Sequence, residues 1–276
     1  MRSHLSYDKI GYWSEIKLEI VRKYAKAYSL ILNAEPRLTH VYIDAFAGAG
    51  MHVAKSTGKF VPGSPLNALE VLPPFKEYHF IDLEGAKIKS LRELASARDN
   101  VHLYHGDCNE ILLNTVFPGV KWEDYRRALC LLDPYGLHLN WEVIEKAGEM
   151  GSIEIFLNFP IADMNRNVLR RDPGNVDPGQ IARMNAYWGD DSWRKAAYTT
   201  TRNLFDLEEK ESNDTVAKAF QVRLREAGGF AYVPDPMPMR NSTGATVYYL
   251  FFASQKPVAQ KIVSDIFGKY RNRGVV

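Results

Sequence analysis

Hydrophobic positions recur at two different spacings along the chain. Near the N-terminus they are separated by three or four residues, and charged side chains fall mostly between them: Trp13, Ile16, Ile20, Tyr24, Ala27 and Ile31. This spacing predicts an amphipathic helix packed on the side of a sheet, within residues 1–35. Ser14 is placed to cap its start.

Five short apolar runs follow, rich in Val, Ile, Leu, Phe and Tyr: 40–46, 77–83, 101–107, 128–134 and 153–160. Such composition is typical of strands buried on both faces. Helical patterns lie between them, as in 86–98 and 141–150. The alternation predicts a doubly wound, mostly parallel α/β sheet of the Rossmann-like type.

The pattern changes after residue 160. Residues 161–200 are polar and rich in Arg, Asn, Asp and Pro, which indicates an insertion at the substrate rim. A helix is expected over 214–229 and another over 258–270, with a C-terminal antiparallel hairpin formed by 230–240 and 246–254. We expect a single domain spanning residues 1–276.

Composition narrows the class of protein. Among 276 residues, 46% are hydrophobic and 25% charged, as in ordinary globular proteins, and a net charge of +2 neither indicates nor excludes a nucleic-acid partner. Cys108 and Cys130 fit no zinc spacing and are typical of core residues in a reducing compartment. No run is long enough to span a bilayer, and the N-terminus lacks a secretory pattern. We therefore expect a cytoplasmic enzyme with no membrane association and no bound metal.

The strand ends carry the candidate chemistry, because ligands of open parallel sheets bind beyond the carboxyl ends of the strands. The first run leads into Asp44-Ala45-Phe46-Ala47-Gly48-Ala49-Gly50. The third glycine of a dinucleotide fingerprint is missing, and Asp44 suits a ligand with an ammonium group, such as a methionine moiety. A structural turn is the alternative interpretation of this loop.

The next three runs end on carboxylates. Asp82 is placed to bind ribose hydroxyls and Asp107 the exocyclic amine of an adenine, although each could instead cap the following helix. The fourth run ends Asp133-Pro134-Tyr135-Gly136. A carboxylate followed by proline and an aromatic ring can hold a flat amine and direct its lone pair at an activated methyl group. The alternative is a simple Asp-Pro turn.

Six short motifs taken together resemble the three-Cys-motif partner protein family: DAFAGAG, GSPLNAL, FIDLE, GDCNE, LLDPYGLHLNW and IFLNFP. The resemblance implies a Rossmann-like methyltransferase using S-adenosylmethionine, and a cysteine-rich partner protein. It places the reaction centre at Asp133, Pro134 and Tyr135. It implies a cofactor site made by Asp44, Phe46, Gly48, Gly50, Asp82, Leu83, Asp107 and Cys108. The DPYG motif has one proline fewer than the DPPY of adenine amino-methyltransferases and is similar to the DPFG of transfer-RNA guanine amino-methyltransferases.

The acceptor is expected on the same rim. Asn158, Phe159 and Pro160 follow the fifth run, and Arg166 and Arg170 could hold phosphates. The leading hypothesis is methylation of an exocyclic amine of a nucleobase in DNA or RNA. A methyltransferase acting on a small molecule or protein is one alternative. A non-catalytic, nucleotide-binding partner of a three-Cys-motif protein is another.

Overall fold

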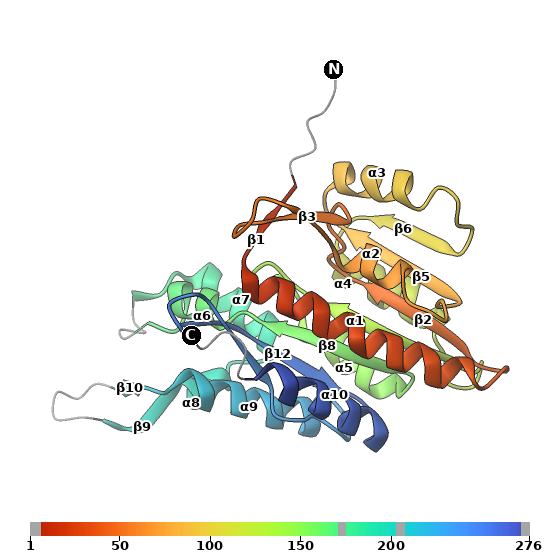
Figure 1. Cartoon of the computed structure of the whole chain (residues 1–276). Coiled ribbons are helices and arrows are strands. Elements are labelled where there is room, and N and C mark those ends of the chain that lie inside the picture. The colour runs from red at the N-terminus through yellow and green to blue at the C-terminus, as the bar shows by residue number, and fades with distance from the viewer. Residues whose placement is uncertain (1–6, 171–174, 203–207, 272–276) are drawn as a thin grey trace.

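A seven-stranded sheet with the order β11-β12-β8-β7-β2-β5-β6 forms the centre of the computed structural model, which describes residues 7–170, 175–202 and 208–271 (Figure 1). Its strands are β2 (Thr39–Asp44), β5 (Glu77–Asp82), β6 (Val101–His105), β7 (Arg126–Leu132), β8 (Ile153–Phe159), β11 (Met237–Arg240) and β12 (Thr246–Ala253). The first five pair in parallel, whereas β12 is antiparallel to β8 and β11 to β12. The predicted doubly wound sheet with a C-terminal antiparallel hairpin is confirmed.

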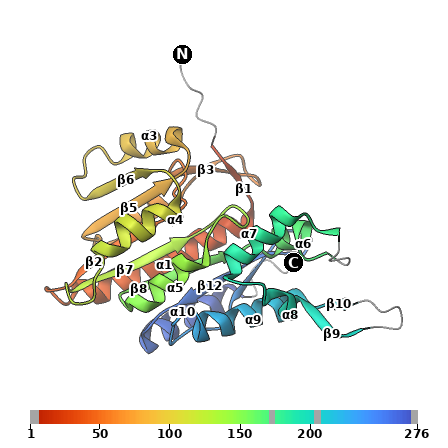
Figure 2. The same cartoon turned by 180° about the vertical axis from the view of Figure 1, so that it is seen from behind.

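Two hydrophobic cores cover the two faces of this sheet. Val41, Ile43 and Cys130 point into one core and Tyr42, Leu129 and Leu131 into the other, as strand alternation requires. Seen from the front, one face carries α1 (Tyr12–Asn33), α2 (Ser64–Leu69), α3 (Gly85–Leu94) and α10 (Pro257–Tyr270). From behind, Figure 2 shows α4 (Cys108–Ile111), α5 (Trp141–Met150), α7 (Pro178–Trp188), α8 (Trp193–Ala197) and α9 (Asn213–Glu226) on the other face.

Several elements were not expected from the sequence. A small sheet of order β1-β3-β4 lies over the N-terminal end of α1 and is built from β1 (Lys9–Ile10), β3 (Met51–Ala54) and β4 (Phe60–Pro62). The polar region 161–200 contains α6 (Ile161–Asn167), α7, α8 and the start of β9 (Tyr198–Arg202), which pairs with β10 (Glu208–Lys210). Residues 171–174 of that region lie outside the described part of the chain. Two short helical turns, Leu112–Val116 and Phe117–Gly119, continue from α4.

The predicted cap at Ser14 is wrong. Helix α1 begins at Tyr12, and Gly11 occupies the N-cap in an extended conformation, so Ser14 lies inside the first turn. Residues 1–6 of the expected N-terminal segment lie outside the described residues. The apolar stripe nevertheless marks the buried face correctly, since Ile16, Ile20 and Tyr24 all lie in the core.

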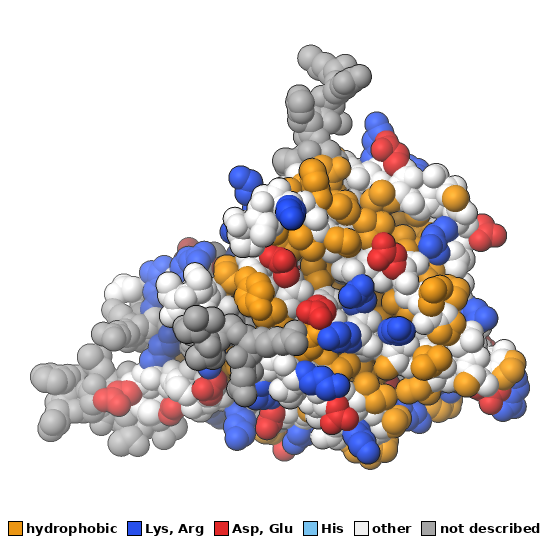
Figure 3. All heavy atoms as spheres, viewed as in Figure 1, with side chains coloured by type: hydrophobic (Ala, Val, Ile, Leu, Met, Phe, Trp, Pro, Cys, Tyr) orange, Lys and Arg blue, Asp and Glu red, His pale blue; other side chains and the backbone are white. Residues whose placement is uncertain are grey.

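The surface agrees with the small net charge of the chain. Figure 3 shows acidic and basic side chains interspersed over the face that carries α1 and α10. Within the described ranges, no helix combines the length and apolar character that crossing a membrane requires.

Candidate active site

Two adjoining cavities lie beyond the carboxyl ends of the parallel strands. One, of about 210 Å³, lies between the ends of β2, β5 and β6, and the other, of about 160 Å³, lies between α1, the loop after β2 and the end of β7. Phe46 and Tyr135 line both cavities. We refer to them below as the strand-end cavity and the helix-side cavity. Their position is the one at which a doubly wound sheet binds its ligand.

Asp44 lies at the end of β2 and has an unsatisfied carboxylate. The side chain is 0% exposed; Oδ1 accepts the Phe46 N–H at 3.2 Å, whereas Oδ2 has no hydrogen-bond partner. Burial raises the pKa of Asp44 to about 7, against the opposing effects of the nearby Ser64 hydroxyl and the Phe46 N–H. A buried carboxylate with a free lone pair is poised to receive a cationic group, directly or through a water molecule.

The two glycines of the loop have backbone conformations that other residues rarely adopt. The φ angles of Gly48 and Gly50 are +66° and +84°. A Cβ atom on Gly50 would lie 2.7 Å from Leu94 Cδ1, so α3 packs directly against this backbone. The loop therefore requires glycine both for its conformation and for the close approach of α3.

Asp82, at the end of β5, holds the loop in place. Its Oδ2 accepts the Gly48 N–H at 2.8 Å, and its Oδ1 accepts the Glu84 N–H at 2.8 Å. Each carboxylate oxygen has two lone pairs, so each can accept one further bond from a ligand hydroxyl. Asp82 lines the strand-end cavity, where a ribose would reach it.

The helix-capping role considered for Asp107 is confirmed. Its Oδ1 accepts the N–H groups of Asn109 and Glu110, at 2.7 Å and 3.4 Å, so it caps α4. It also lines the strand-end cavity, with the neighbouring Cys108 and with Leu83. Burial raises the pKa of the Cys108 thiol to about 12, which makes it part of the cavity wall and not a nucleophile.

Asp133 is engaged by a residue that lies 116 positions away in the sequence. The Lys17 ammonium of α1 donates to Asp133 Oδ2 in an ion pair, and both line the helix-side cavity. The side chain of Lys17 is 8% exposed and that of Asp133 24%. Tyr248 of β12 lies behind the pair, with its ring centroid 5.5 Å from Lys17 Nζ. The carboxylate is thus held in one orientation by a buried charge.

Tyr135 stands at the junction of the two cavities. Its ring is 61% exposed, its hydroxyl donates to Asp8 Oδ2 at 3.2 Å, and Lys87 Nζ lies 5.5 Å from the ring centroid. Lys87 also pairs with Asp8 at 3.3 Å. Asp8, in the segment just before β1, therefore holds Tyr135 and Lys87 in place. This segment is itself fixed because β1 pairs with β3.

The expected acceptor residues separate into three groups. Asn158 lines the helix-side cavity, and its Oδ1 is buried without a hydrogen-bond partner. Phe159 is fully buried, its ring packed on Phe220 and Phe251, so in this arrangement the ring is core and does not reach a ligand. Pro160 is buried at the N-cap of α6. Arg166 and Arg170 are exposed, and neither lines the two cavities.

Sequence reasoning did not find Lys17, His52, Lys87 or Tyr248. Lys17 left a signal: it lies four residues after Trp13 and three before Ile20, on the apolar face of α1, where an unpaired lysine would be costly. His52 lies on β3, Lys87 on α3 and Tyr248 on β12, and each reaches the site only through the packing of its element. Their contacts are set by tertiary structure.

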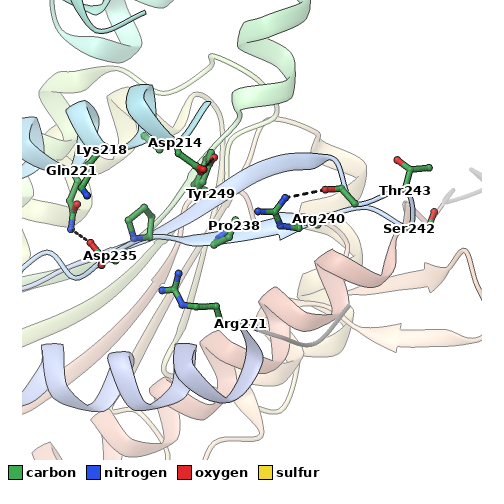
Figure 4. Close-up of a pocket in the computed structure, with 13 residues that line it drawn as sticks. Asp214, Lys218, Gln221, Asp235, Pro238, Arg240, Ser242, Thr243, Tyr249 and Arg271 are labelled. Carbon is green, nitrogen blue, oxygen red and sulfur yellow. Dashed lines mark hydrogen bonds between the residues drawn. The ribbon is translucent and has the colours of Figure 1, made fainter. Parts of the chain in front are cut away.

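A larger cavity lies away from these strand ends. It has about 780 Å³ and is bordered by α9, β11, β12 and the end of α10 (Figure 4). Its charged lining residues are Asp214, Lys218, Asp235, Arg240 and Arg271. Tyr249 lines it, whereas the adjacent Tyr248 lines the helix-side cavity, so this groove and the site lie on opposite faces of β12.

The chain is similar to several solved structures, and the first of those that follow supports the fold. A protein from Legionella pneumophila, LPL1258, has 13% sequence identity and a TM-score of 0.50, with 96% of this chain and 94% of that chain covered. The M. jannaschii TYW2 protein, crystallised in complex with AdoMet, has 11% identity and a TM-score of 0.39 over 88% of this chain and 75% of its own. The methyltransferase domain of bacterial CtHen1 has 10% identity and a TM-score of 0.42 over 85% and 99%. No protein-family model matches the sequence, and no curated protein matches it.

Proposed function

We propose that this protein is an S-adenosylmethionine-dependent methyltransferase acting on an exocyclic amine of a nucleobase in DNA or RNA. The observation that carries the proposal is the grouping of three strand-end carboxylates: Asp82 and Asp133 line the two cavities, and the buried Asp44, whose Oδ2 has no hydrogen-bond partner, lies behind the cavity wall, two residues before Phe46. A bound cofactor would direct its ammonium group toward Asp44, place its ribose hydroxyls on Asp82 and lay its adenine beside Asp107. When bound, it would supply a methyl group activated by a positive sulfur.

The Asp133 carboxylate suits a neutral amine acceptor. Lys17 occupies Oδ2, which leaves Oδ1 to accept one amine N–H, and the carbonyl of Pro134 lies next in the chain. Hydrogen bonding of both amine protons would direct the nitrogen lone pair toward the methyl group. Asp133 or a water molecule would accept the proton that the amine loses when it takes the methyl group.

Tyr135 offers a stacking surface for a planar acceptor. Its ring is the exposed aromatic face at the junction of the cavities, and its hydroxyl and ring are fixed by Asp8 and Lys87. Stacking on an aromatic side chain is the common way in which proteins hold an unpaired base. A base presented to this site would have to be single-stranded or flipped from a duplex.

The groove at β11 favours a polymeric nucleic acid. Its two acids are engaged by neutral groups: Asp214 accepts the Tyr249 hydroxyl, and Asp235 accepts Gln221 Nε2 at 3.4 Å. Lys218 and Arg271, by contrast, form no ion pair with any acid in the described part of the chain. Available cations on the other side of β12 from the helix-side cavity suit phosphate contacts that position a strand. The sequence resemblance adds a three-Cys-motif partner to the proposal, and the composition of the chain adds a cytoplasmic location.

The first test is cofactor binding. Titration calorimetry with S-adenosylmethionine and with S-adenosylhomocysteine should give saturable binding of both, and failure to bind either would refute the proposal.

The second test identifies the acceptor. Tritium-labelled cofactor should label RNA or DNA from a total extract. The Asp133→Asn variant should bind cofactor as before but lose transfer, whereas Asp265→Asn, exposed on α10, should retain both. Labelling of protein or small molecules alone would overturn the assignment of the acceptor.

A further inference from the structure

Three potential metal ligands meet at the opposite end of the same strands. Glu77 begins β5, His79 follows two residues later on the same face, and His102 lies directly across from His79 on the neighbouring strand β6. One oxygen or nitrogen of each residue lies within 4.8 Å of the others. The sequence analysis expected no metal site, because these residues match no spacing rule and converge only through strand pairing.

We propose that Glu77, His79 and His102 bind a zinc-class divalent ion. Glu77 Oε1 lies 3.0 Å from His79 Nε2 and 3.3 Å from His102 Nε2. Ligand atoms around a tetrahedral zinc ion, with bonds of about 2.0–2.1 Å, are separated by roughly 3.3 Å. The two distances from Glu77 Oε1 are therefore close to those of a formed site, and all three ligand atoms lie within 4.8 Å of one another.

The alignment of these atoms also favours a metal over a hydrogen-bond network. Despite the 3.0 Å separation, His79 Nε2 is buried without a hydrogen-bond partner. This arrangement would arise if the lone pairs of Glu77 Oε1 and His79 Nε2 both pointed toward one metal ion. A hydrogen bond would instead require an N–H of His79 to point at the Glu77 oxygen. The ring of His79 is stacked on that of His102, with centroids 4.9 Å apart, which brings both Nε2 atoms to the same side.

Surrounding groups orient the ligands in the way that metal sites require. The Tyr104 hydroxyl lies 3.0 Å from His79 Nδ1, so an Nδ1–H donated to it would leave Nε2 with the lone pair. Arg126 donates to Glu77 Oε2 and leaves Oε1 for the ion. With three protein ligands, and with His102 44% exposed, a fourth position is open to water.

The site is separate from the proposed cofactor site. Glu77 and Asp82 lie at the two ends of β5, five residues or roughly 16 Å apart along the strand. A bound ion would fasten the edge strand β6 to β5, and the end of β6 leads to Asp107. Its expected effect is therefore on stability, with little effect on transfer.

Untagged protein, stripped with a chelator and dialysed, would be titrated with zinc chloride against a chromophoric chelator. One ion per chain should bind with micromolar or tighter affinity, and the melting temperature should rise. Cobalt(II) should give the visible bands of a tetrahedral site. Removal of one ligand in His102→Ala should weaken zinc binding by roughly 100-fold or more, given that loss of even an orienting partner costs about 10–100-fold.

The matched control is His105→Gln, on the same strand but the opposite face, where the imidazole lies 3.1 Å from the Leu83 carbonyl oxygen and packs beside Gly85. It should bind zinc as the parent protein does. Because His102 is exposed, its variant should fold, and Glu77→Gln provides a second removal of a ligand. Absence of stoichiometric binding, or equal binding by His102→Ala and the parent, would overturn the proposal. Neither outcome bears on cofactor binding, so the two proposals are tested independently.

Discussion

Lys17 of the N-terminal helix forms an ion pair with Asp133 at the end of the fourth parallel strand. The pair joins the first helix of the chain to the proposed reaction centre. It leaves one carboxylate oxygen, Oδ1, for the acceptor. A buried charge that fixes a reacting group supports catalysis through geometry, since small misplacements of reacting groups lower rates strongly.

The first prediction is that Lys17→Met lowers kcat by about 10- to 100-fold with little change in cofactor affinity. The variant leaves Asp133 free to rotate and removes no group expected to contact the cofactor. Rates of labelled methyl transfer and calorimetric dissociation constants measure the two effects. Lys26→Met, exposed on the same helix, is the matched control.

A double-mutant cycle separates this role from simple destabilisation. If Lys17 acts through Asp133, the double variant Lys17→Met, Asp133→Asn should be no slower than Asp133→Asn alone. Independent, multiplying losses would show that Lys17 acts elsewhere. Lys17→Arg should restore part of the rate, because it keeps the charge.

The second prediction concerns the pH dependence of cofactor binding. Burial holds the pKa of Asp44 at about 7, so the free protein carries a neutral Asp44 below that pH. Binding of an ammonium group favours the ionised form. The affinity for S-adenosylmethionine should therefore rise as the pH increases from 6 to 8, by up to about tenfold, and level off above pH 8.

Two controls isolate Asp44. Methylthioadenosine lacks the amino-acid portion, so its affinity should not change over this range. Asp44→Asn should bind the full cofactor weakly and without the pH dependence. A pH dependence that persists in Asp44→Asn would assign the titration to another group.

The same shift predicts the sign of a stability effect. Because the folded-state pKa of Asp44 exceeds the ordinary value of 3.8, the folded protein holds a proton that the unfolded chain releases between about pH 4 and 7. The contribution of Asp44 to the free energy of unfolding therefore falls as the pH rises through this interval. Without cofactor, Asp44→Asn should melt at a higher temperature than the parent protein at pH 8, as thermal unfolding can measure.

The sheet could be predicted from the sequence because its strands are long, apolar and buried. Each of the five parallel strands lies within one or two residues of its apolar run. In β2, β5, β7 and β8, burial on both faces leaves little room for polar side chains, whereas the edge strand β6 is only partly buried. The small β1-β3-β4 sheet could not be predicted. Its three strands are two to four residues long and half exposed, and β1 is joined to β3 only by pairing over 44 positions.

The candidate site could be predicted only in part: its strand-end carboxylates could, and the side chains from other elements could not. Asp44, Asp82, Asp107 and Asp133 end strands, and parallel strands bring their carboxyl ends to one edge, so sequence order alone groups them. The side chains that complete the cavities come from α1, β3 and β12. The positions of these side chains in the cavities depend on how the helices and the antiparallel hairpin pack against the sheet. The local sequence around Tyr248 therefore does not predict that Tyr248 lines a cavity.

The third prediction concerns the glycine loop. Gly50→Ala should lower the free energy of unfolding by about 1–2 kcal/mol through its positive φ, with a further loss from the contact with Leu94. It should also weaken cofactor binding, because the loop that holds Asp44 and Gly48 must shift. Gly58→Ala is the matched control: its φ is +67°, but no atom lies within 4 Å of the added carbon. Denaturant unfolding and calorimetry measure both quantities, and equal effects of the two variants would contradict the close packing of α3.

The last prediction tests the groove beside β11. If Lys218 and Arg240 contact phosphates, the double variant Lys218→Ala, Arg240→Ala should bind single-stranded nucleic acid more weakly, whatever its sequence, and should reduce the slope of log affinity against log salt by roughly two. Cofactor affinity should not change, because the groove lies on the other face of β12 from the cavities. Lys261→Ala, exposed on α10, controls for the loss of a positive charge. Fluorescence anisotropy across a salt series gives the slopes, and an unchanged slope in the double variant would place the strand elsewhere on the protein.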